Sequence, residues 1–333
     1  MQGSKFLVAI ALCVVATLAQ AAGLRSIDVP ADAAGPTLKG GMWSPCSEPP
    51  DEVVLGGRTM PGVKDCSISG DKLPLIVVSH GNGGSFINFR DMAETLADAG
   101  FIVVAIDHPG DNSADASRVA DLSVFVERPT DIGRLLDFML NASPAAPKIN
   151  PERIGFFGFS AGGYTGLVLA GANPDWAGPL CRRNRSAAAA SACEQILRRE
   201  FRVQPLAHDP RIKAAVIADP ANYFSADSFA LVKIPVQLWA SERAGRGLQQ
   251  VDPRLTPESV AAVDRNLPAK HEYHVVPNAG HFAFLSPCPP TLAKDNPTNA
   301  EICTDAPGFD RVAFHKQFNA DVLGFFRTHF GDQ

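Results

Sequence analysis

The sequence predicts an α/β protein built on a mostly parallel β-sheet with helices on both faces. Short, continuous apolar runs rich in β-branched residues alternate along the chain with longer amphipathic stretches. This pattern is typical of strands that are buried on both faces and joined by crossover helices. Several of the runs end in clusters of glycine and polar residues. Because ligands bind at the carboxyl ends of parallel strands, these clusters are candidate sites.

The expected elements follow one another in a regular order. Strands are expected at residues 73–79, 101–106, 153–158, 212–218, 234–240 and 271–276. Helices are expected at about residues 92–97, 131–140, 164–172 and 309–329. Residues 24–70 are rich in Gly and Pro, which favours one or two edge strands joined by turns. Residues 23–333 are therefore expected to form one domain.

One segment breaks the alternation of strands and helices. Residues from about 173 to 209 contain two cysteines, four consecutive alanines and several arginines. We interpret this segment as a helical insertion. It would lie over the strand ends, where a lid would cover a site.

Composition and the N-terminal residues indicate an exported globular protein. The chain has 333 residues, 46% of them hydrophobic, and a net charge of −5, which does not favour nucleic acid or an anionic membrane as a partner. Residues 1–22 have the pattern of a signal peptide: Lys5, an apolar run from Phe6 to Leu18, and Ala19-Gln20-Ala21 as a cleavage site. The apolar run is too short to span a bilayer comfortably. A secreted or periplasmic location with no integral membrane segment after cleavage is expected.

Export makes disulfides the expected use of the cysteines. Six cysteines remain after residue 22, and they fall into three pairs that are close in sequence and separate from one another. The predicted disulfides are Cys46–Cys66, Cys181–Cys193 and Cys288–Cys303. No C-x-x-C or H-E-x-x-H pattern is present, so no metal site is expected.

Ser160 is the candidate nucleophile. It lies in Gly158-Phe159-Ser160-Ala161-Gly162, between an expected strand and an expected helix. A G-x-S-x-G motif in that context forms a sharp turn that exposes the serine hydroxyl, and the glycines avoid clashes at the turn. The start of the following helix stabilises negative charge near the serine.

A serine nucleophile needs a base and an acid that orients the base. His281 is the candidate base because it follows the last expected strand, after a flexible Asn-Ala-Gly turn. Asp219, at the end of another strand, is favoured as the acid, and Glu242, after the next strand, is the alternative. Structural roles are expected for the remaining histidines other than His80: His108, His208, His271, His274, His315 and His329.

Two backbone N–H groups are the candidate oxyanion donors. One belongs to Ala161, directly after the serine, and the other to Asn82 in the glycine-rich loop 80–84. His80 is interpreted as a residue that orients this loop. The cluster at residues 107–112 also ends a strand, and we interpret it as a set of hydrogen bonds that braces the loop.

The ordered set of these motifs resembles the α/β-hydrolase superfamily. Within it, the chain is similar to the bacterial predicted dienelactone hydrolase group, which is itself similar to platelet-activating-factor acetylhydrolase. The residues that carry the resemblance, over roughly residues 24–330, are His80-Gly81-Asn82-Gly83-Gly84, Ala105-Ile106-Asp107-His108-Pro109-Gly110, Gly158-Phe159-Ser160-Ala161-Gly162-Gly163, Asp219 and Gly280-His281. The resemblance implies an eight-stranded sheet, ester hydrolysis without a cofactor, and Asp219 as the acid. Dienelactone hydrolases use cysteine where this chain has Ser160, so dienelactone does not carry over as the substrate.

These expectations together describe a secreted serine carboxylic-ester hydrolase that works through a Ser-His-Asp triad and a covalent acyl-enzyme. Its partner would be a small-molecule or lipid ester. One alternative is a lipase-like, phospholipase-like or polyester hydrolase that acts on longer or insoluble esters. An alternative of another class is a non-catalytic binding protein with the same fold.

Overall fold

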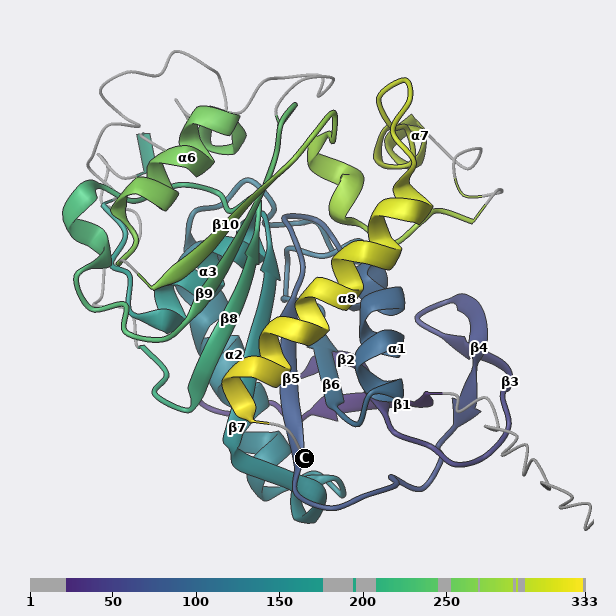
Figure 1. Ribbon diagram of the computed structural model, residues 1–333. Helices are drawn as coiled ribbons and strands as arrows, with labels where there is room; N and C mark the ends of the chain where they lie inside the picture. The colour runs from purple at the N-terminus through teal and green to yellow at the C-terminus, as the bar shows by residue number, and fades with distance from the viewer. Residues whose placement is uncertain are drawn as a thin grey trace, which may run out of the picture.

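A large β-sheet forms the centre of the structure (Figure 1). The computed structural model describes residues 22–175, 194–195, 208–244, 253–268, 270–289, 292 and 297–331. The strands are β1 (Gly23–Val29), β2 (Leu38–Ser44), β3 (Asp51–Leu55), β4 (Arg58–Lys64), β5 (Leu73–Ser79), β6 (Ile102–Ile106), β7 (Ile149–Phe159), β8 (Ile212–Ala218), β9 (Val236–Ser241) and β10 (His271–Val276). The helices are α1 (Arg90–Asp98), α2 (Ser123–Asn141), α3 (Ala161–Ala170), α6 (Pro257–Asn266), α7 (Pro297–Ile302) and α8 (Arg311–Phe330).

The described strands pair in the order β10-β9-β8-β7-β5-β6-β2-β1-β4-β3. The strands from β10 to β6 are all parallel, whereas β2 runs antiparallel to β6 and β1 antiparallel to β2. The mostly parallel sheet expected from the sequence is therefore confirmed, but its size differs. Ten strands take part instead of eight, because a hairpin of β3 and β4 continues the sheet beyond β1.

The additional hairpin has an ordinary local cause. Gly56 and Gly57 both have positive φ, and they join β3 to β4 as a two-residue turn. Such a turn matches the twist of a hairpin and needs glycine or a similar residue. The disulfide between Cys46 and Cys66 links the segments that enter and leave the hairpin. This part of the chain projects beside the main sheet in Figure 1.

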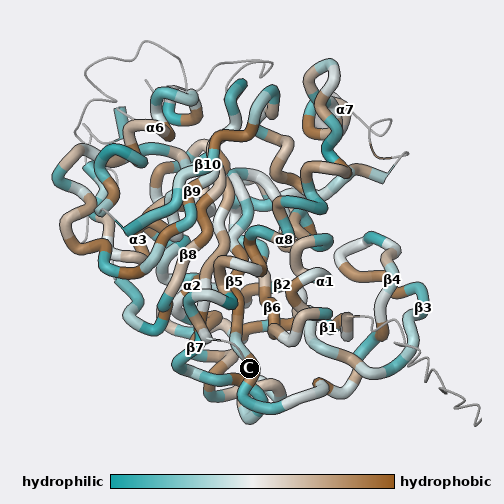
Figure 2. The backbone as a smooth tube through the Cα atoms, in the orientation of Figure 1, coloured by the Kyte–Doolittle hydropathy of each residue, from teal (hydrophilic) through white to brown (hydrophobic). Residues whose placement is uncertain are grey.

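Helices cover both faces of the sheet because the central strands are apolar on both sides. In β5, Leu75 and Val77 face a core shared with α2, α3 and α6, while Ile76 and Val78 face a core shared with α1 and α8. Alternation of side chains along a strand produces this division. Figure 2 shows the hydrophobic residues concentrated in the strands and the hydrophilic ones in the surrounding loops.

Some of the sequence-based expectations concern residues that are not described. The signal peptide at 1–22 lies outside the described residues except for residue 22, and the lid segment at 173–209 lies mostly outside them. The Cys181–Cys193 pair also lies outside, whereas Cys46–Cys66 and Cys288–Cys303 are both present as disulfides. None of the described helices combines the length and the apolar character needed to cross a membrane.

A partly buried carboxyl group in α1 has no hydrogen-bond partner at one oxygen. The Oε1 atom of Glu94 is inaccessible to solvent and contacts no donor in the described part of the chain. Burial raises the pKa of Glu94 to about 7, against the opposing charge of Arg90. The folded protein therefore binds this proton more tightly than the unfolded chain does.

The Glu94→Gln variant is expected to remove the free-energy cost of ionising Glu94 in the folded protein. Stability that depends on the neutral carboxyl is fully present below about pH 4.5 and is lost as the pH rises through about 7. We expect the variant to match the wild type near pH 4.5 and to exceed it at pH 8 by about 1–3 kcal/mol. Urea unfolding at both pH values measures this difference. Glu52→Gln, at an exposed position on β3, is the control and should show no such difference.

Candidate active site

Ser160 lies in a strained turn between β7 and α3. Its φ of 55° and ψ of −115° place it in a region that non-glycine residues rarely adopt. The flanking glycines are sterically required. A Cβ on Gly158 would lie 2.2 Å from the carbonyl oxygen of Gly162, and a Cβ on Gly162 would lie 2.0 Å from that of Ser79. The turn therefore depends on close backbone contacts that only glycine permits.

His281 begins a short 3-10 helix, η5 (His281–Phe284), shortly after β10. Its Nδ1 atom lies 3.1 Å from the Oδ2 atom of Asp219, and both side chains are buried. Its ring also contacts the ring of Phe159, the residue before Ser160, with centroids 4.6 Å apart. The structure therefore brings the predicted base next to the serine turn and onto the favoured acid.

Asp219 is held in place by the end of the neighbouring strand. It follows β8 with a positive φ of 40°. Its Oδ1 atom accepts a hydrogen bond of 2.8 Å from the backbone N–H of Ser241, and its Oδ2 atom accepts one from the Ser241 hydroxyl. These two hydrogen bonds fix the orientation of the carboxylate beside His281.

Glu242 faces a different group. Its Oε2 atom accepts a hydrogen bond of 2.6 Å from the backbone N–H of Asn278. Asn278 has a φ of 58°, and its side chain accepts a further hydrogen bond from Arg243. Glu242 therefore stabilises the turn that leads to His281, while the contact with the His281 ring comes from Asp219.

The glycine-rich loop 80–84 lies directly against the serine. A Cβ on Gly81 would lie 3.2 Å from the Cβ of Ser160. The Asn82 N–H donates to no acceptor among the described residues, and Ala161 begins α3, so its N–H has no partner within that helix. One predicted oxyanion donor therefore follows Ser160 directly in the chain, and the other follows Gly81, which lies against Ser160.

A buried ion pair holds this loop. Both Arg128 and Asp111 are fully buried, and the Arg128 guanidinium donates two hydrogen bonds, of 2.7 and 3.0 Å, to the Oδ2 atom of Asp111. The other carboxylate oxygen of Asp111 accepts from the Gly83 N–H at 2.7 Å and from the Asn82 side chain at 3.0 Å. Arg128 also donates to the carbonyls of His80 and Gly81. The ion pair thus forms hydrogen bonds with four of the five loop residues, His80 to Gly83.

Arg128 is not predicted from the sequence, although its position carries a signal. It lies four residues before Ile132 and so on the buried stripe of α2. The expected helix at 131–140 begins later because Pro129 normally marks a helix start or a break. In the structure α2 begins at Ser123 and continues through Pro129. A charged residue on an apolar stripe is the feature that would have indicated a buried role.

A second serine–histidine–aspartate arrangement lies beneath the loop. The Nε2 atom of His108 is 2.9 Å from the Ser79 hydroxyl, and its Nδ1 atom is 2.9 Å from the Asp131 carboxylate. Ser79 and His108 have no exposed surface. Burial lowers the pKa of His108 well below its usual value and raises that of Asp131 to about 7. The inaccessible serine suits a bracing role rather than a catalytic one, as expected for the 107–112 cluster.

His80 also has the loop-orienting position expected of it. Its Nε2 atom accepts a hydrogen bond from the backbone N–H of His108, so its Nδ1–H donates to the carbonyl of Gly81 at 2.6 Å. Burial, with the charge of Arg128 as a second cause, lowers the pKa of His80 well below its usual value. A neutral ring in one defined tautomer therefore connects the strand end to the loop.

Potential metal ligands meet at one place among the described residues. Cys46, Glu48 and Cys66 lie together there. The two sulfur atoms are bonded to each other, so neither is free to act as a thiolate ligand.

Comparisons with known proteins agree with this architecture. A family model described as the alpha/beta hydrolase fold matches residues 74–176, which include the loop 80–84 and Ser160. The putative esterase NocK of Nocardia uniformis subsp. tsuyamanensis is 27% identical over 191 residues, which are 55% of this chain and 52% of that protein. The chain thus spans about half the length of this curated relative.

Solved structures extend the similarity to most of the chain. A ferulic acid esterase from Streptomyces cinnamoneus matches with a TM-score of 0.62 and 21% identity, over 92% of this chain and 89% of that one. A dienelactone hydrolase from Anabaena variabilis matches with a TM-score of 0.50 and 15% identity, over 92% and 98% of the two chains. By its strand order, its serine turn and these similarities, the chain is an α/β-hydrolase-fold protein.

Proposed function

We propose that this protein is an exported serine hydrolase that cleaves carboxylic esters, with Ser160 as the nucleophile, His281 as the base and Asp219 as the acid. The observation that carries the proposal is the buried contact of 3.1 Å between His281 and Asp219, next to the strained turn of Ser160. Carboxylate–imidazole pairs beside a serine activate it for acyl transfer. The similarity to a protein named as a putative esterase and to one named as a ferulic acid esterase supports the same class.

The proposed reaction has two steps. His281 accepts the proton of the Ser160 hydroxyl as its oxygen attacks the ester carbonyl, and the Asp219 carboxylate stabilises the imidazolium that forms. The N–H groups of Asn82 and Ala161 donate to the oxyanion. His281 then protonates the leaving alcohol. Water, deprotonated by His281, hydrolyses the acyl-enzyme and regenerates Ser160.

Longer or insoluble esters remain the alternative substrates within this class. A lipase-like, phospholipase-like or polyester hydrolase would use the same residues and differ in how the acyl chain is accommodated. A chain-length series of p-nitrophenyl esters, together with an insoluble polyester film, separates the two. A maximum of kcat/KM at short acyl chains supports a small-ester hydrolase, whereas a maximum at long chains or release of soluble products from the film supports the alternative.

Export is supported by two independent features. The N-terminal residues have the pattern of a signal peptide, and the described residues contain two disulfides, Cys46–Cys66 and Cys288–Cys303. Disulfides persist in oxidising compartments such as the periplasm or the medium. We therefore propose a secreted or periplasmic location.

Replacement of the proposed triad residues tests the function directly. We expect Ser160→Ala and His281→Gln to lower kcat by about 10⁴-fold or more, and Asp219→Asn to lower it by a similar order. Glu242→Gln should stay within about tenfold of wild type, because Glu242 contacts the turn and not the imidazole. Initial rates with p-nitrophenyl acetate provide the measurement. Full activity of Ser160→Ala would refute the proposal.

A fluorophosphonate probe distinguishes an enzyme from a non-catalytic binding protein. We expect mass spectrometry to locate the adduct on Ser160. An unlabelled wild-type protein would favour the binding protein.

The buried ion pair provides a test of the oxyanion loop. Arg128→Lys cannot restore the paired hydrogen bonds to Asp111, so the loop 80–84 should lose its fixed position. We expect kcat to fall by about 10²–10³-fold, with a smaller change in KM. Arg134→Lys is the matched control, because Arg134 is also buried in α2 but binds Asp32 and residues 30 and 35 instead of the loop. Equal losses of kcat in both variants would contradict the assigned role of Arg128.

A further inference from the structure

The turn that carries His281 is attached to α8 by a second histidine. The Nε2 atom of His315 lies 2.8 Å from the carbonyl oxygen of Ala283, two residues after His281 in the same 3-10 helix. His315 is 3% exposed. Asp219 fixes the ring of His281, and His315 contacts the backbone that carries that ring.

Both ring nitrogens of His315 face groups that accept hydrogen bonds. Its Nδ1 atom lies 2.7 Å from the Oδ2 atom of Asp91 in α1. A backbone carbonyl has no proton to donate. Burial raises the pKa of Asp91, but the hydrogen bond and charge of His315, with hydrogen bonds from Ser286 and Asn319, lower it to about 2. Asp91 is therefore a carboxylate at neutral pH, and two N–H donors on one ring require an imidazolium.

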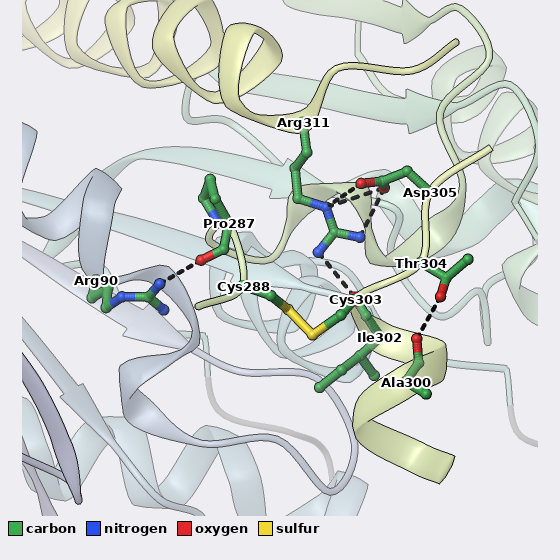
Figure 3. The surroundings of a disulfide bond; sticks show 9 residues. All are labelled: Arg90, Pro287, Cys288, Ala300, Ile302, Cys303, Thr304, Asp305 and Arg311. Carbon is green, nitrogen blue, oxygen red and sulfur yellow. Dashed lines mark hydrogen bonds and ion pairs between the residues drawn. A yellow bond between two sulfur atoms is a disulfide. The ribbon is translucent and has the colours of Figure 1, made fainter. Parts of the chain in front are cut away.

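Asp91 also contacts two side chains besides His315. It accepts hydrogen bonds from the Ser286 hydroxyl and, at 2.8 Å, from the Asn319 side chain. The neighbouring Arg90 donates to the carbonyl of Pro287 at 2.5 Å, and Figure 3 shows this contact beside the Cys288–Cys303 disulfide. The segment that follows His281 is thus attached to α8 at Ala283 and to α1 at Ser286 and Pro287.

This attachment restrains a part of the chain that is locally permissive. His281 follows Asn278, which has positive φ, and Gly280, beside which a Cβ would meet no atom within 4 Å. The turn before His281 is held at Asn278 by Glu242 and Arg243, and the attachment of His315 to Ala283 holds the chain on the other side of the base. A displacement of about 1 Å in a reacting group costs up to about 10²-fold in rate.

We propose that His315 is a positioning residue for the base: as an imidazolium it links the carboxylate of Asp91 to the carbonyl of Ala283 and so holds His281 over Ser160. The inference rests on the proposed function and adds a residue that acts through His281 without touching the substrate. The bond to Ala283 is the part that positions the base, whereas the bond to Asp91 supplies the charge and anchors the ring.

Two substitutions separate these bonds. The side-chain amide of Gln approximates the Nε2–H of histidine, so His315→Gln can still donate to Ala283, whereas His315→Asn approximates the Nδ1–H and can donate only to Asp91. We expect His315→Asn to lower kcat by about 10–10²-fold with KM within about twofold of wild type, and His315→Gln to retain kcat within about threefold. The rate of Ser160 labelling by a fluorophosphonate should follow kcat. Thermal unfolding should show comparable destabilisation of both variants.

Asn319→Ala provides the matched control. It removes a hydrogen bond to Asp91 on the same helix but leaves Ala283 untouched, so it should lower the melting temperature and leave kcat unchanged. Equal kcat in the two His315 variants, or a loss confined to KM, would overturn the inference. If the wild type is active and Ser160→Ala is inactive, such a result removes the role of His315 alone. A wild type that neither hydrolyses esters nor reacts with the probe would instead remove the proposed function.

A measurement on the unmodified protein covers the case in which a variant does not fold. Nitrogen-15 NMR of histidine-labelled wild-type protein at pH 7 should show both ring nitrogens of His315 protonated. A neutral ring with one unprotonated nitrogen would overturn the inference.

Discussion

The ion pair between Arg128 and Asp111 is the interaction on which the geometry of the candidate site depends. Removing water from two charges is costly, and a buried pair is retained only when the remaining donors and acceptors are satisfied. Here the backbone and the side chain of the loop 80–84 complete that set. The loop therefore supplies the hydrogen bonds that water would supply to these two charges if they were exposed. Loss of either charge would leave the other unpaired, at a cost of about 3–5 kcal/mol.

The sequence predicts well the parts of the fold that repeat a simple pattern. Five of the six central strands lie within two residues of their predicted bounds, because an apolar run buried on both faces has few other uses, whereas β7 begins at Ile149, four residues before its predicted start. The structure also places His281 against Asp219, since both residues follow strands whose carboxyl ends meet at one edge of the sheet. Both features follow from the alternation of strands and helices along the chain, which the sequence pattern indicates directly.

The parts that the sequence did not predict depend on tertiary contacts. Pro129 is a local signal for a helix start, and only the burial of the preceding turn shows that α2 continues through it. The role of Asp91 and His315 requires α1 and α8 to lie side by side, although the residues are 224 positions apart. The β3–β4 hairpin did have a local signal in Gly56-Gly57, but its joining to β1 did not. The hydrophobic periodicity of a segment indicates its own secondary structure but not which elements pack against it.

Three histidines near the site differ in what their nitrogens face. His108 and His80 each pair one donor with one acceptor, which suits a neutral ring, whereas His315 faces two acceptors. The same residue type thus braces a loop or links two acceptors, according to its partners. His281 faces a carboxylate on one side, which leaves its other nitrogen for proton transfer.

The Cys288–Cys303 disulfide has a consequence for resistance to proteases. The chain between these residues forms a closed loop, so a single peptide-bond cleavage within it would leave the two ends covalently joined. The upstream end would still be attached to α1 through Arg90 and Asp91, and the downstream end to the start of α8, where Arg311 binds Asp305 (Figure 3). A protein cleaved there by a protease would keep His281 in place as a two-chain molecule.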